Sequence, residues 1–236
     1  MKVLQILPQL NIGGVERGTL DLSKALIHKG HQSFVISGGG VLVDELTQCG
    51  AKHYEIPVHI KSLRTLSLAK RLSETISSID PDIVHVRSRM PAWVNYRAFK
   101  MLQKKPLLVS TFHGLYSFPI YSKVMSFVDH SIAISRTVER YILENYKLDK
   151  GNITVIPRGC DPLEFNNEVI NPVDKANIIE EFPQIVGKKV LTIPGRITKW
   201  KGVAEFIDLL SLLDDNYHGL IVGPTAESKK KYLNKL

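Results

Sequence analysis

The sequence predicts an α/β protein built on a doubly wound parallel sheet, with a Rossmann-like N-terminal domain followed by the beginning of a second Rossmann-like domain. Short apolar runs of strand length alternate with helix-length periodic segments almost from end to end. Several runs are nearly continuous, as at residues 3–7, which is typical of parallel strands covered on both faces. The alternation is interrupted once and then starts again. Strands and helices in alternation place helices on both faces of a parallel sheet.

The first domain is expected to span residues 1–165, with the strand-then-helix pattern of repeated βαβ units. Its predicted strands are short apolar runs, and they lie at residues 2–7, 32–36, 52–56, 83–86, 107–111, 130–134 and 153–156. The segments between them carry apolar residues at helical spacing. Helices are predicted there at residues 15–28, 63–78, 91–103, 120–127 and 136–145.

Prolines and asparagines interrupt this pattern between residues 162 and 188. Because both residue types favour turns, residues 166–187 are expected to form an interdomain segment with one short helix. Beyond it, the same criteria predict strands at 189–193 and 219–222 and helices at 202–213 and 226–236. This partial C-terminal domain, residues 188–236, has two strands, buries little surface and leaves a sheet edge unpaired, so the sequence is expected to be truncated.

The composition is that of a soluble globular protein, with 44% hydrophobic and 23% charged residues. No apolar run approaches the ~20 residues of a membrane-spanning helix, and the first run is too short for the core of a signal peptide. The only cysteines, Cys49 and Cys160, are far apart and lack the spacing of metal ligands. They indicate a protein in a reducing compartment, and hence a cytoplasmic location.

A glycine turn follows the first predicted strand and leads into a helix, with Gly13 and Gly14 ahead of Glu16 and Arg17. Glycine lets a ligand approach the backbone, and the free N–H groups of a helix N-terminus attract anions. The dinucleotide-binding pattern Gly-x-Gly-x-x-Gly is absent, as is the acidic residue expected after the second strand. The P-loop pattern fails because its lysine is missing. A tight turn without a ligand and a ligand-binding turn of another kind both stay open.

Three further segments carry polar or cationic residues beside predicted strands. Thr-Phe-His-Gly at residues 111–114 places His113 at the carboxyl end of a strand, where parallel sheets bind ligands. Val-Ile-Pro-Arg-Gly-Cys-Asp occupies residues 155–161, with Phe165 downstream. Pro-Gly-Arg-Ile-Thr-Lys-Trp-Lys-Gly occupies residues 194–202, after the first strand of the second domain.

Together, in this order and covering essentially the whole chain, the four segments resemble the family-4 glycosyltransferases of GT-B architecture that build bacterial cell-surface polysaccharide and lipopolysaccharide. The resemblance implies a transferase of the hexosyltransferase type that uses a nucleotide-diphosphate sugar. It implies catalytic roles for His113, beside the transferred sugar, and for Arg196 and Lys201, at the departing diphosphate. The residues that it implies for donor or acceptor binding are Gly13, Gly14, Glu16, Arg17, Gly114, Arg158 and Gly195.

The chain departs from the family pattern in two places. Arg158 replaces the asparagine that is common in the segment Ile-Pro-Asn-Gly-Val-Asp, so the role of this position is open. The Glu-x7-Glu element that grips the donor in the family would lie beyond Leu236. The resemblance therefore implies either an incomplete chain or a separate chain that supplies the rest of the C-terminal domain.

Sugar transfer develops negative charge on the departing diphosphate, and fixed cations stabilise that charge more in the transition state than in the ground state. Arg196 can fork two phosphate oxygens, and Lys201 adds a point charge five residues later. No paired acid–base carboxylates and no Asp-x-Asp motif are recognisable, which fits a retaining enzyme that needs no metal and no cofactor besides the sugar donor. The alternatives are a merely packed His113 and two surface cations that cap a helix.

The net charge of +8 is concentrated in residues 61–105, which hold ten Lys or Arg and three acidic residues. Trp93, Arg97, Lys100 and Lys104 share one helical face there, as in an interfacial helix on anionic lipid. With the lipid-linked or polysaccharide acceptor that the resemblance implies, a peripheral position on the inner face of a membrane is expected. The alternative is an ordinary surface helix with a partly buried Trp93. Nucleic acid is not expected, because no recognition motif accompanies the charge.

Two other classes of function stay open on sequence grounds. One is a folded but catalytically inactive remnant of a glycosyltransferase, and donor binding distinguishes it from an enzyme. The other is an anion-binding module at a membrane surface, which would bind anionic vesicles whether or not Arg196 is present. A dehydrogenase is disfavoured, because the carboxylate that would hold a ribose is missing.

Overall fold

The computed structural model describes residues 1–60, 67–116, 119–163, 165–166, 171–225 and 230–236. The chain divides into two units, Met1–Gly159 and Cys160–Leu236. The division falls shortly after the last strand of the first sheet. The predicted interdomain segment, residues 166–187, lies within the second unit.

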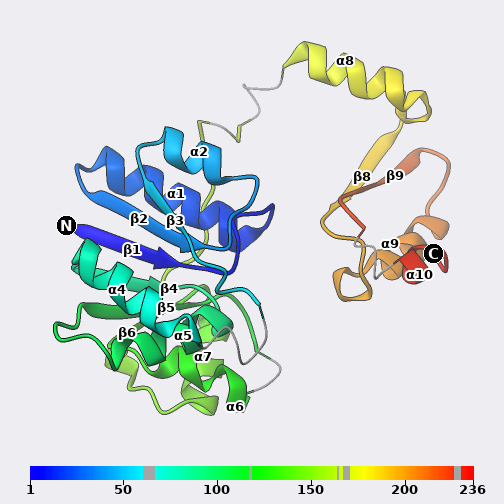
Figure 1. Ribbon diagram of the computed structural model, residues 1–236. Helices are drawn as coiled ribbons and strands as arrows, with labels where there is room; N and C mark the ends of the chain where they lie inside the picture. The colour runs from blue at the N-terminus through cyan, green and yellow to red at the C-terminus, as the bar shows by residue number, and fades with distance from the viewer. Residues whose placement is uncertain (61–66, 117–118, 164, 167–170, 226–229) are drawn as a thin grey trace. The chain divides into compact units, whose positions relative to one another are not determined.

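The first unit is built on a seven-stranded sheet in the order β3-β2-β1-β4-β5-β6-β7 (Figure 1). Every neighbouring pair is parallel. The strands are β1 (Lys2–Ile6), β2 (Gln32–Ser37), β3 (Lys52–Glu55), β4 (Ile83–Val86), β5 (Leu107–Phe112), β6 (His130–Ala133) and β7 (Ile153–Val155). The strand order reverses between β1 and β4, which confirms the predicted doubly wound, Rossmann-like fold. In such sheets ligands bind at this switch point, outside the carboxyl ends of the strands.

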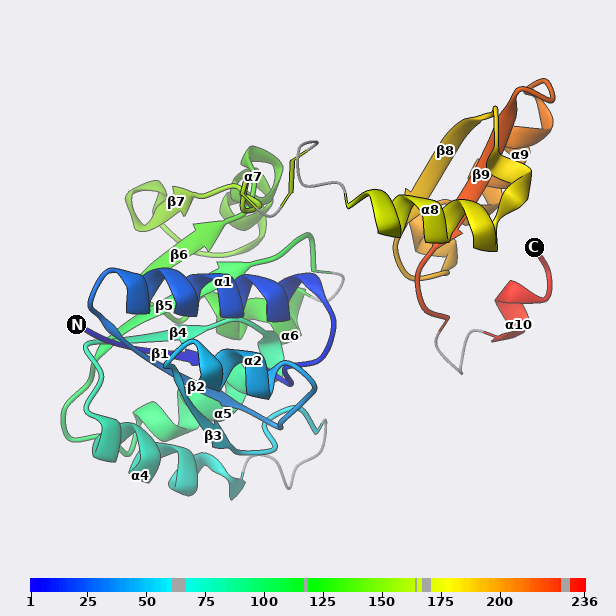
Figure 2. The same cartoon turned by 90° about the horizontal axis from the view of Figure 1, so that it is seen from above.

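Helices cover both faces of this sheet. The helices α1 (Gly14–His28) and α2 (Val43–Gln48) lie on one face, and α4 (Ala69–Ile79) and α5 (Arg89–Phe99) lie on the other (Figures 1 and 2). The other helical segments among the described residues of this unit are α6 (Pro119–Ser122), η1 (Lys123–Ser126), α7 (Arg136–Asn145) and η2 (Lys150–Asn152), of which η1 and η2 are 3-10 helices. Coverage on both faces explains why the strands are apolar almost throughout.

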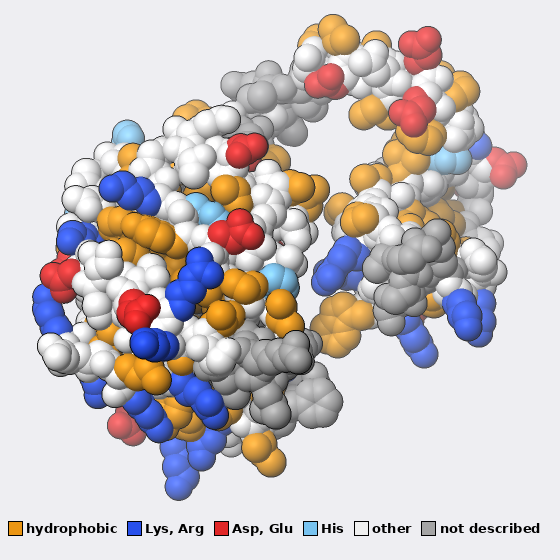
Figure 3. All heavy atoms as spheres, viewed as in Figure 1, with side chains coloured by type: hydrophobic (Ala, Val, Ile, Leu, Met, Phe, Trp, Pro, Cys, Tyr) orange, Lys and Arg blue, Asp and Glu red, His pale blue; other side chains and the backbone are white. Residues whose placement is uncertain are grey.

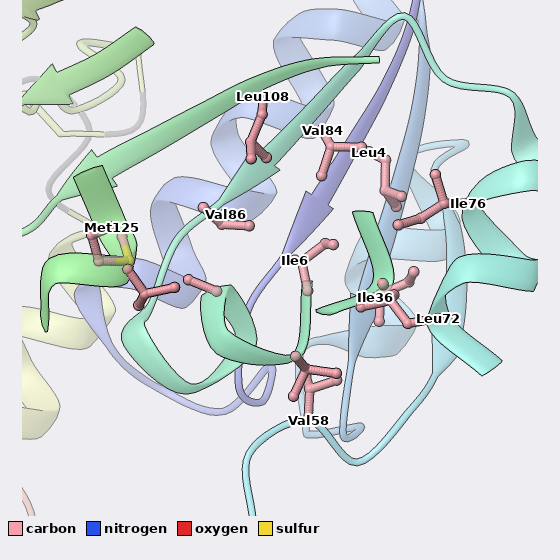
Figure 4. Close-up of a cluster of buried hydrophobic side chains, with 14 of the residues drawn as sticks. Leu4, Ile6, Ile36, Val58, Leu72, Ile76, Val84, Val86, Leu108 and Met125 are labelled. Atoms are coloured by element: carbon pink, nitrogen blue, oxygen red, sulfur yellow. The ribbon is translucent and has the colours of Figure 1, made fainter. Parts of the chain in front are cut away.

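Two clusters of buried side chains hold the helices to the sheet. The smaller cluster packs Leu20 of α1 and Leu46 of α2 against Val35 of β2. The larger one includes Leu72 and Ile76 of α4, packed against β1 and β4 (Figure 4). A fully buried Leu or Ile contributes roughly 1.5–3 kcal/mol of transfer free energy. These contacts position the carboxyl edge of the sheet.

The second unit contains a two-stranded parallel sheet of β8 (Lys189–Pro194) and β9 (Tyr217–Val222). The helical segments in its described part are α8 (Pro172–Glu181), η4 (Pro183–Ile185), η5 (Lys199–Lys201), α9 (Val203–Ser211) and α10 (Lys230–Leu233). Val203 is the one fully buried hydrophobic residue in the described part of this unit. Its sheet is therefore much less covered than the sheet of the first unit.

The observed elements follow the predicted ones closely, with differences that have physical causes. The sequence does not predict α2, because a six-residue helix is too short to show helical periodicity. The helix predicted at 91–103 begins two residues earlier, at Arg89, since Pro91 is tolerated in a first turn whose N–H groups have no intrahelical acceptor. It also ends earlier, at Phe99.

Three other predicted helices are altered or only partly described. The helix predicted at 120–127 is divided into α6 and the 3-10 helix η1. The first part of the helix predicted at 63–78 lies outside the described residues, and α4 begins at Ala69. Likewise, residues 226–229 of the last predicted helix are outside the described part, and α10 covers Lys230–Leu233.

Candidate functional site

A cavity of about 260 Å³ lies at the carboxyl edge of the first sheet. Its walls come from α1 and from the ends of β4, β5, β6 and β7, next to the switch point. Its polar lining residues are Asp21, His85, Arg87, Thr111, His113 and Arg158. Its apolar lining includes Leu22, Ile132, Ile134 and Ile156. The site therefore combines cations and histidines with an apolar wall.

Arg158 reaches back from the end of β7 to the start of α1. Its Nη1 donates a hydrogen bond to the carbonyl oxygen of Gly14, and its Nη2 lies 3.2 Å from Nδ1 of His113. The guanidinium packs directly on the bare backbone of Gly18, where an added Cβ would lie 2.9 Å from Nη1. Glycine at position 18 thus makes room for the guanidinium. Gly14, His113 and Arg158, which the sequence singles out separately, meet here.

His113 follows β5 and is largely buried. Because an arginine donates and cannot accept, its contact with Nδ1 leaves the ring proton on Nε2, which is buried and has no hydrogen-bond partner among the described residues. Burial, together with the positive charges of Arg87 and Arg158, lowers the pKa of His113 to about 3. The imidazole is therefore neutral at physiological pH and offers one N–H to a ligand. Gly114 follows it directly, with open space where a side chain would lie.

Arg87 is a site residue that the sequence analysis does not identify. It follows β4 and is 6% exposed, with Nη1 donating to the side-chain oxygen of Gln5 at 2.9 Å. Gln5 is held in turn by α1, through the carbonyl oxygen of Thr19 at 3.1 Å. Burial and the nearby charge of Arg158 lower the pKa of Arg87 to about 10, so it stays a cation at neutral pH. Its position after a buried strand, like that of His113, is the signal that could have revealed it.

The floor of the cavity contains a second neutral histidine. His85 of β4 is buried, and its Nε2 lies 2.7 Å from the hydroxyl of Thr111 in β5. Burial lowers the pKa of His85 well below its usual value, and Arg87 and His113 act in the same direction. The cationic charge of the cavity therefore comes from its two arginines.

Two other charged residues of the glycine turn lie at the start of α1, outside the lining of the cavity. Arg17 pairs with Asp21 at 3.2 Å and with Glu45 of α2 at 3.5 Å. The carboxylate of Glu16 folds back over Gly13, where an added Cβ would lie 2.4 Å from Oε2. A carboxylate at this end of α1 is favoured by the helix dipole. Neither Arg17 nor Glu16 lines the cavity.

The predicted donor-binding residues of the second unit lie just after β8. Gly195 has a φ of 144° and closely approaches Gly223, where an added Cβ would lie 2.0 Å from the Gly195 carbonyl oxygen. Arg196 follows it as an exposed residue. Lys201 lies in η5, at the turn ahead of α9, with its aliphatic carbons near Gly195. Both cations thus lie near the carboxyl end of a parallel strand.

The residues predicted to face a membrane do not form one exposed face. Trp93 is half-buried against the core, and its indole N–H donates to the Tyr121 carbonyl oxygen at 2.9 Å. Arg97 and Lys100 are exposed, and Lys104 pairs with Asp80 at 2.8 Å. Figure 3 shows Lys and Arg side chains gathered on the part of the first unit that carries α4 to α6. The cations are therefore on the surface, whereas Trp93 belongs to the packing beneath them.

No group of three or more His, Cys, Asp or Glu side chains in the described ranges is arranged to hold a metal ion. In the same part of the chain, no helix has the length and apolar character needed to cross a bilayer.

Comparison with known proteins bears on both units. The profile of Glycosyltransferase Family 4 matches residues 12–163. A glycosyltransferase of Rickettsia africae ESF-5 with a solved crystal structure is 33% identical, with a TM-score of 0.80 over 99% of this chain and 63% of that protein. One component of the human phosphatidylinositol N-acetylglucosaminyltransferase is 25% identical over 190 residues, or 72% of this chain and 38% of that protein.

A third protein extends the likeness of fold. Anabaena Alr3699/HepE, solved in complex with UDP and glucose, has a TM-score of 0.81 at 17% identity, and the match covers 100% of this chain and 64% of that protein. At this level of identity, the likeness concerns the fold alone. The chain spans less than two thirds of the length of each of these three relatives.

Proposed function

The chain belongs to Glycosyltransferase Family 4 of GT-B architecture, and we propose from this membership that it serves the transfer of a sugar from a nucleotide-diphosphate donor to an acceptor hydroxyl. The observation that carries the proposal is the neutral His113 at the carboxyl end of β5. It presents a buried, unpartnered Nε2–H to a cavity beside the switch point. A neutral N–H donor suits a hydrogen bond to a sugar hydroxyl, because it carries no charge and does not give up its proton at physiological pH.

Arg158 has a positioning role in this proposal. By donating to Nδ1 it holds the imidazole in the tautomer that presents Nε2–H to the ligand. It also ties the end of β7 to Gly14 at the start of α1. An asparagine, common at this position in the family, is too short for the same double contact. Arg158 therefore makes contacts with Gly14 and His113 that the asparagine of the family segment cannot make.

In the second unit, Arg196 and Lys201 are proposed to bind the donor diphosphate. A forked guanidinium and a compact ammonium at the carboxyl end of β8 offer two cations to oxygens that gain charge as the sugar departs. Each charge-assisted hydrogen bond contributes roughly 1.5–3 kcal/mol. The complex of Alr3699/HepE with UDP and glucose supports a donor of this class.

The finer features of the activity are proposals as well. We propose retention of anomeric configuration, no requirement for a metal ion, and a lipid-linked or polysaccharide acceptor. The name of the human relative, which specifies phosphatidylinositol, supports a lipid acceptor. The exposed cations Arg97 and Lys100 support a peripheral position on the cytoplasmic face of an anionic membrane.

Calorimetric titration with UDP, GDP and ADP, alone and as sugar conjugates, tests the proposal. We expect saturable binding to the nucleotides of one base. Arg196→Ala should weaken it about tenfold or more, as the loss of a charge-assisted hydrogen bond requires. Lys199→Ala removes an exposed cation of the same segment to which no phosphate contact is assigned, and it should leave the affinity within about twofold, as expected of a solvent-screened surface charge. A folded chain that binds none of these compounds would instead be the inactive remnant.

A further inference from the structure

The cavity of the first unit has a surplus of hydrogen-bond donors. Arg87 Nε and His113 Nε2 are both buried, and neither has a partner among the described residues. Arg87 is 6% exposed, and no carboxylate of the described residues forms an ion pair with it. A buried cation without a counter-charge is costly to the fold. Such a group is retained where a ligand supplies the missing acceptor.

The cavity also has more positive than negative side chains in its lining. Two arginines, Arg87 and Arg158, contribute positive charge, while both histidines are held neutral by burial. Asp21 lines the cavity and pairs with Arg17 at 3.2 Å. The carboxylates of Asp21 and Glu16 offset part of the charge of Arg87 and Arg158, although none of the ion pairs of the described residues joins them to either arginine. The cavity therefore keeps an excess of positive charge together with free donors. A phosphate monoester, with three acceptor oxygens and a charge of about −1.5 to −2 at pH 7, can meet Arg87, Arg158 and His113 at once, whereas a carboxylate has two oxygens and a single charge.

The size and walls of the cavity restrict the ligand further. At about 260 Å³ it is smaller than the roughly 300–1,000 Å³ of sites that enclose a drug-sized ligand, so it holds one group of a substrate rather than a whole nucleotide. Ile132, Ile134 and Ile156 make its wall apolar, and low polarity strengthens an arginine–anion contact. A phosphate carried on a carbon chain satisfies both parts of this surface.

We propose that this cavity binds a phosphate group of the acceptor, held by Arg87 and Arg158 with His113 Nε2–H as an additional donor. Phosphate binding itself follows from the cavity. Its assignment to the acceptor rests on the proposed function, in which the donor diphosphate binds Arg196 and Lys201 of the second unit. Arg87 would then select phosphorylated acceptors over neutral ones.

The test is titration of the full chain with glycerol 3-phosphate and inorganic phosphate, with acetate and glycerol as controls. We expect saturable binding of both phosphates and at least tenfold weaker binding of acetate and glycerol. Arg87→Gln and Arg158→Gln should each weaken phosphate binding about tenfold or more. Arg140→Gln, which removes the same charge from a position on α7 outside the cavity, should leave it nearly unchanged. No saturable phosphate binding, or acetate bound as tightly as phosphate, would overturn the proposal.

Two further measurements test whether Arg87 contacts the phosphate and whether that phosphate belongs to the acceptor or to the donor. Because Arg87→Gln can also disturb the contact with Gln5, the Arg87 Nε–H resonance of the unaltered protein is followed by NMR during the phosphate titration. A shift that saturates with the calorimetric affinity supports the assignment, and a resonance that does not move contradicts it. UDP, GDP and ADP are titrated in parallel. If Arg87→Gln lowers the affinity for the nucleotide that binds as much as it lowers phosphate affinity, the cavity holds the donor phosphate and the acceptor assignment fails. If none of the three nucleotides binds but phosphate does, the proposed function fails while the phosphate site stands.

Discussion

Replacing Gly18 by alanine separates the stability of the fold from the function of the cavity. The new Cβ would lie 2.9 Å from Arg158 Nη1 and 3.1 Å from Nη2, closer than the ordinary 3.4–4 Å of van der Waals contact. The guanidinium is the far end of a flexible side chain, so it moves away rather than deforming α1. That movement breaks its hydrogen bonds to Gly14 and His113.

The two consequences have opposite signs. Alanine in place of glycine inside a helix stabilises it by about 0.5–1 kcal/mol. Loss of the hydrogen bonds of the exposed Arg158 costs a comparable amount, about 1 kcal/mol. The free energy of unfolding should therefore change by less than about 1 kcal/mol. Affinity for phosphate should fall about tenfold or more, because a charge-assisted hydrogen bond is lost.

Urea denaturation and calorimetric titration of the same preparation measure both quantities. The matched control is Gly151→Ala, since a Cβ at position 151 meets nothing within 4 Å. Phosphate affinity that stays within twofold in Gly18→Ala would refute the role of the Arg158 guanidinium in the cavity. A loss of stability above about 3 kcal/mol, as in overpacked cores, would instead show that the guanidinium cannot move.

Three other predictions concern acid stability, the second unit and the basic surface. His113 has a pKa of about 3 in the folded protein and about 6.5 in the unfolded chain, so its contribution to stability falls as the pH drops from 6.5 towards 3. Between pH 6 and 4, the unfolding free energy of His113→Asn should therefore depend on pH less steeply than that of the unaltered protein, by about 1 kcal/mol per pH unit. An unchanged slope would contradict the burial assigned to His113. Amide hydrogens of β8 and β9 should exchange faster than those of β1 and β4, because Val203 is the one fully buried hydrophobic residue in the described part of their unit; equal protection in both sheets would show that a cover exists. The double variant Arg97→Gln, Lys100→Gln should weaken the salt-sensitive binding of the protein to anionic vesicles. Trp93→Phe should lower the stability of the fold and leave vesicle binding intact. If Trp93→Phe instead weakens vesicle binding and leaves stability unchanged, Trp93 lies at the lipid.

The sequence by itself determines most of the elements, and it places nearly all strand bounds within one residue. The strand Ile83–Val86 and the helix Arg136–Asn145 have the predicted limits, because strand and helix periodicities are local properties of the chain. It also determines which residues follow buried parallel strands, and for that reason His113 and Arg196 could be singled out as site candidates. The family follows from short segments whose order and spacing are a property of the sequence.

Only the tertiary structure decides which of these residues meet. Arg158 and Gly14 are 144 residues apart in sequence, and their contact depends on the strand order that brings β7 and β1 into one sheet. The same order buries Arg87 between Gln5 and the cavity, where its pairing depends on packing from several elements rather than on its neighbours in sequence. Trp93 likewise has the helical spacing of a surface residue, yet the carbonyl oxygen of Tyr121 accepts its N–H and the ring of Phe127 packs edge-on against it. Periodicity specifies a face, and packing against distant segments decides whether that face is exposed.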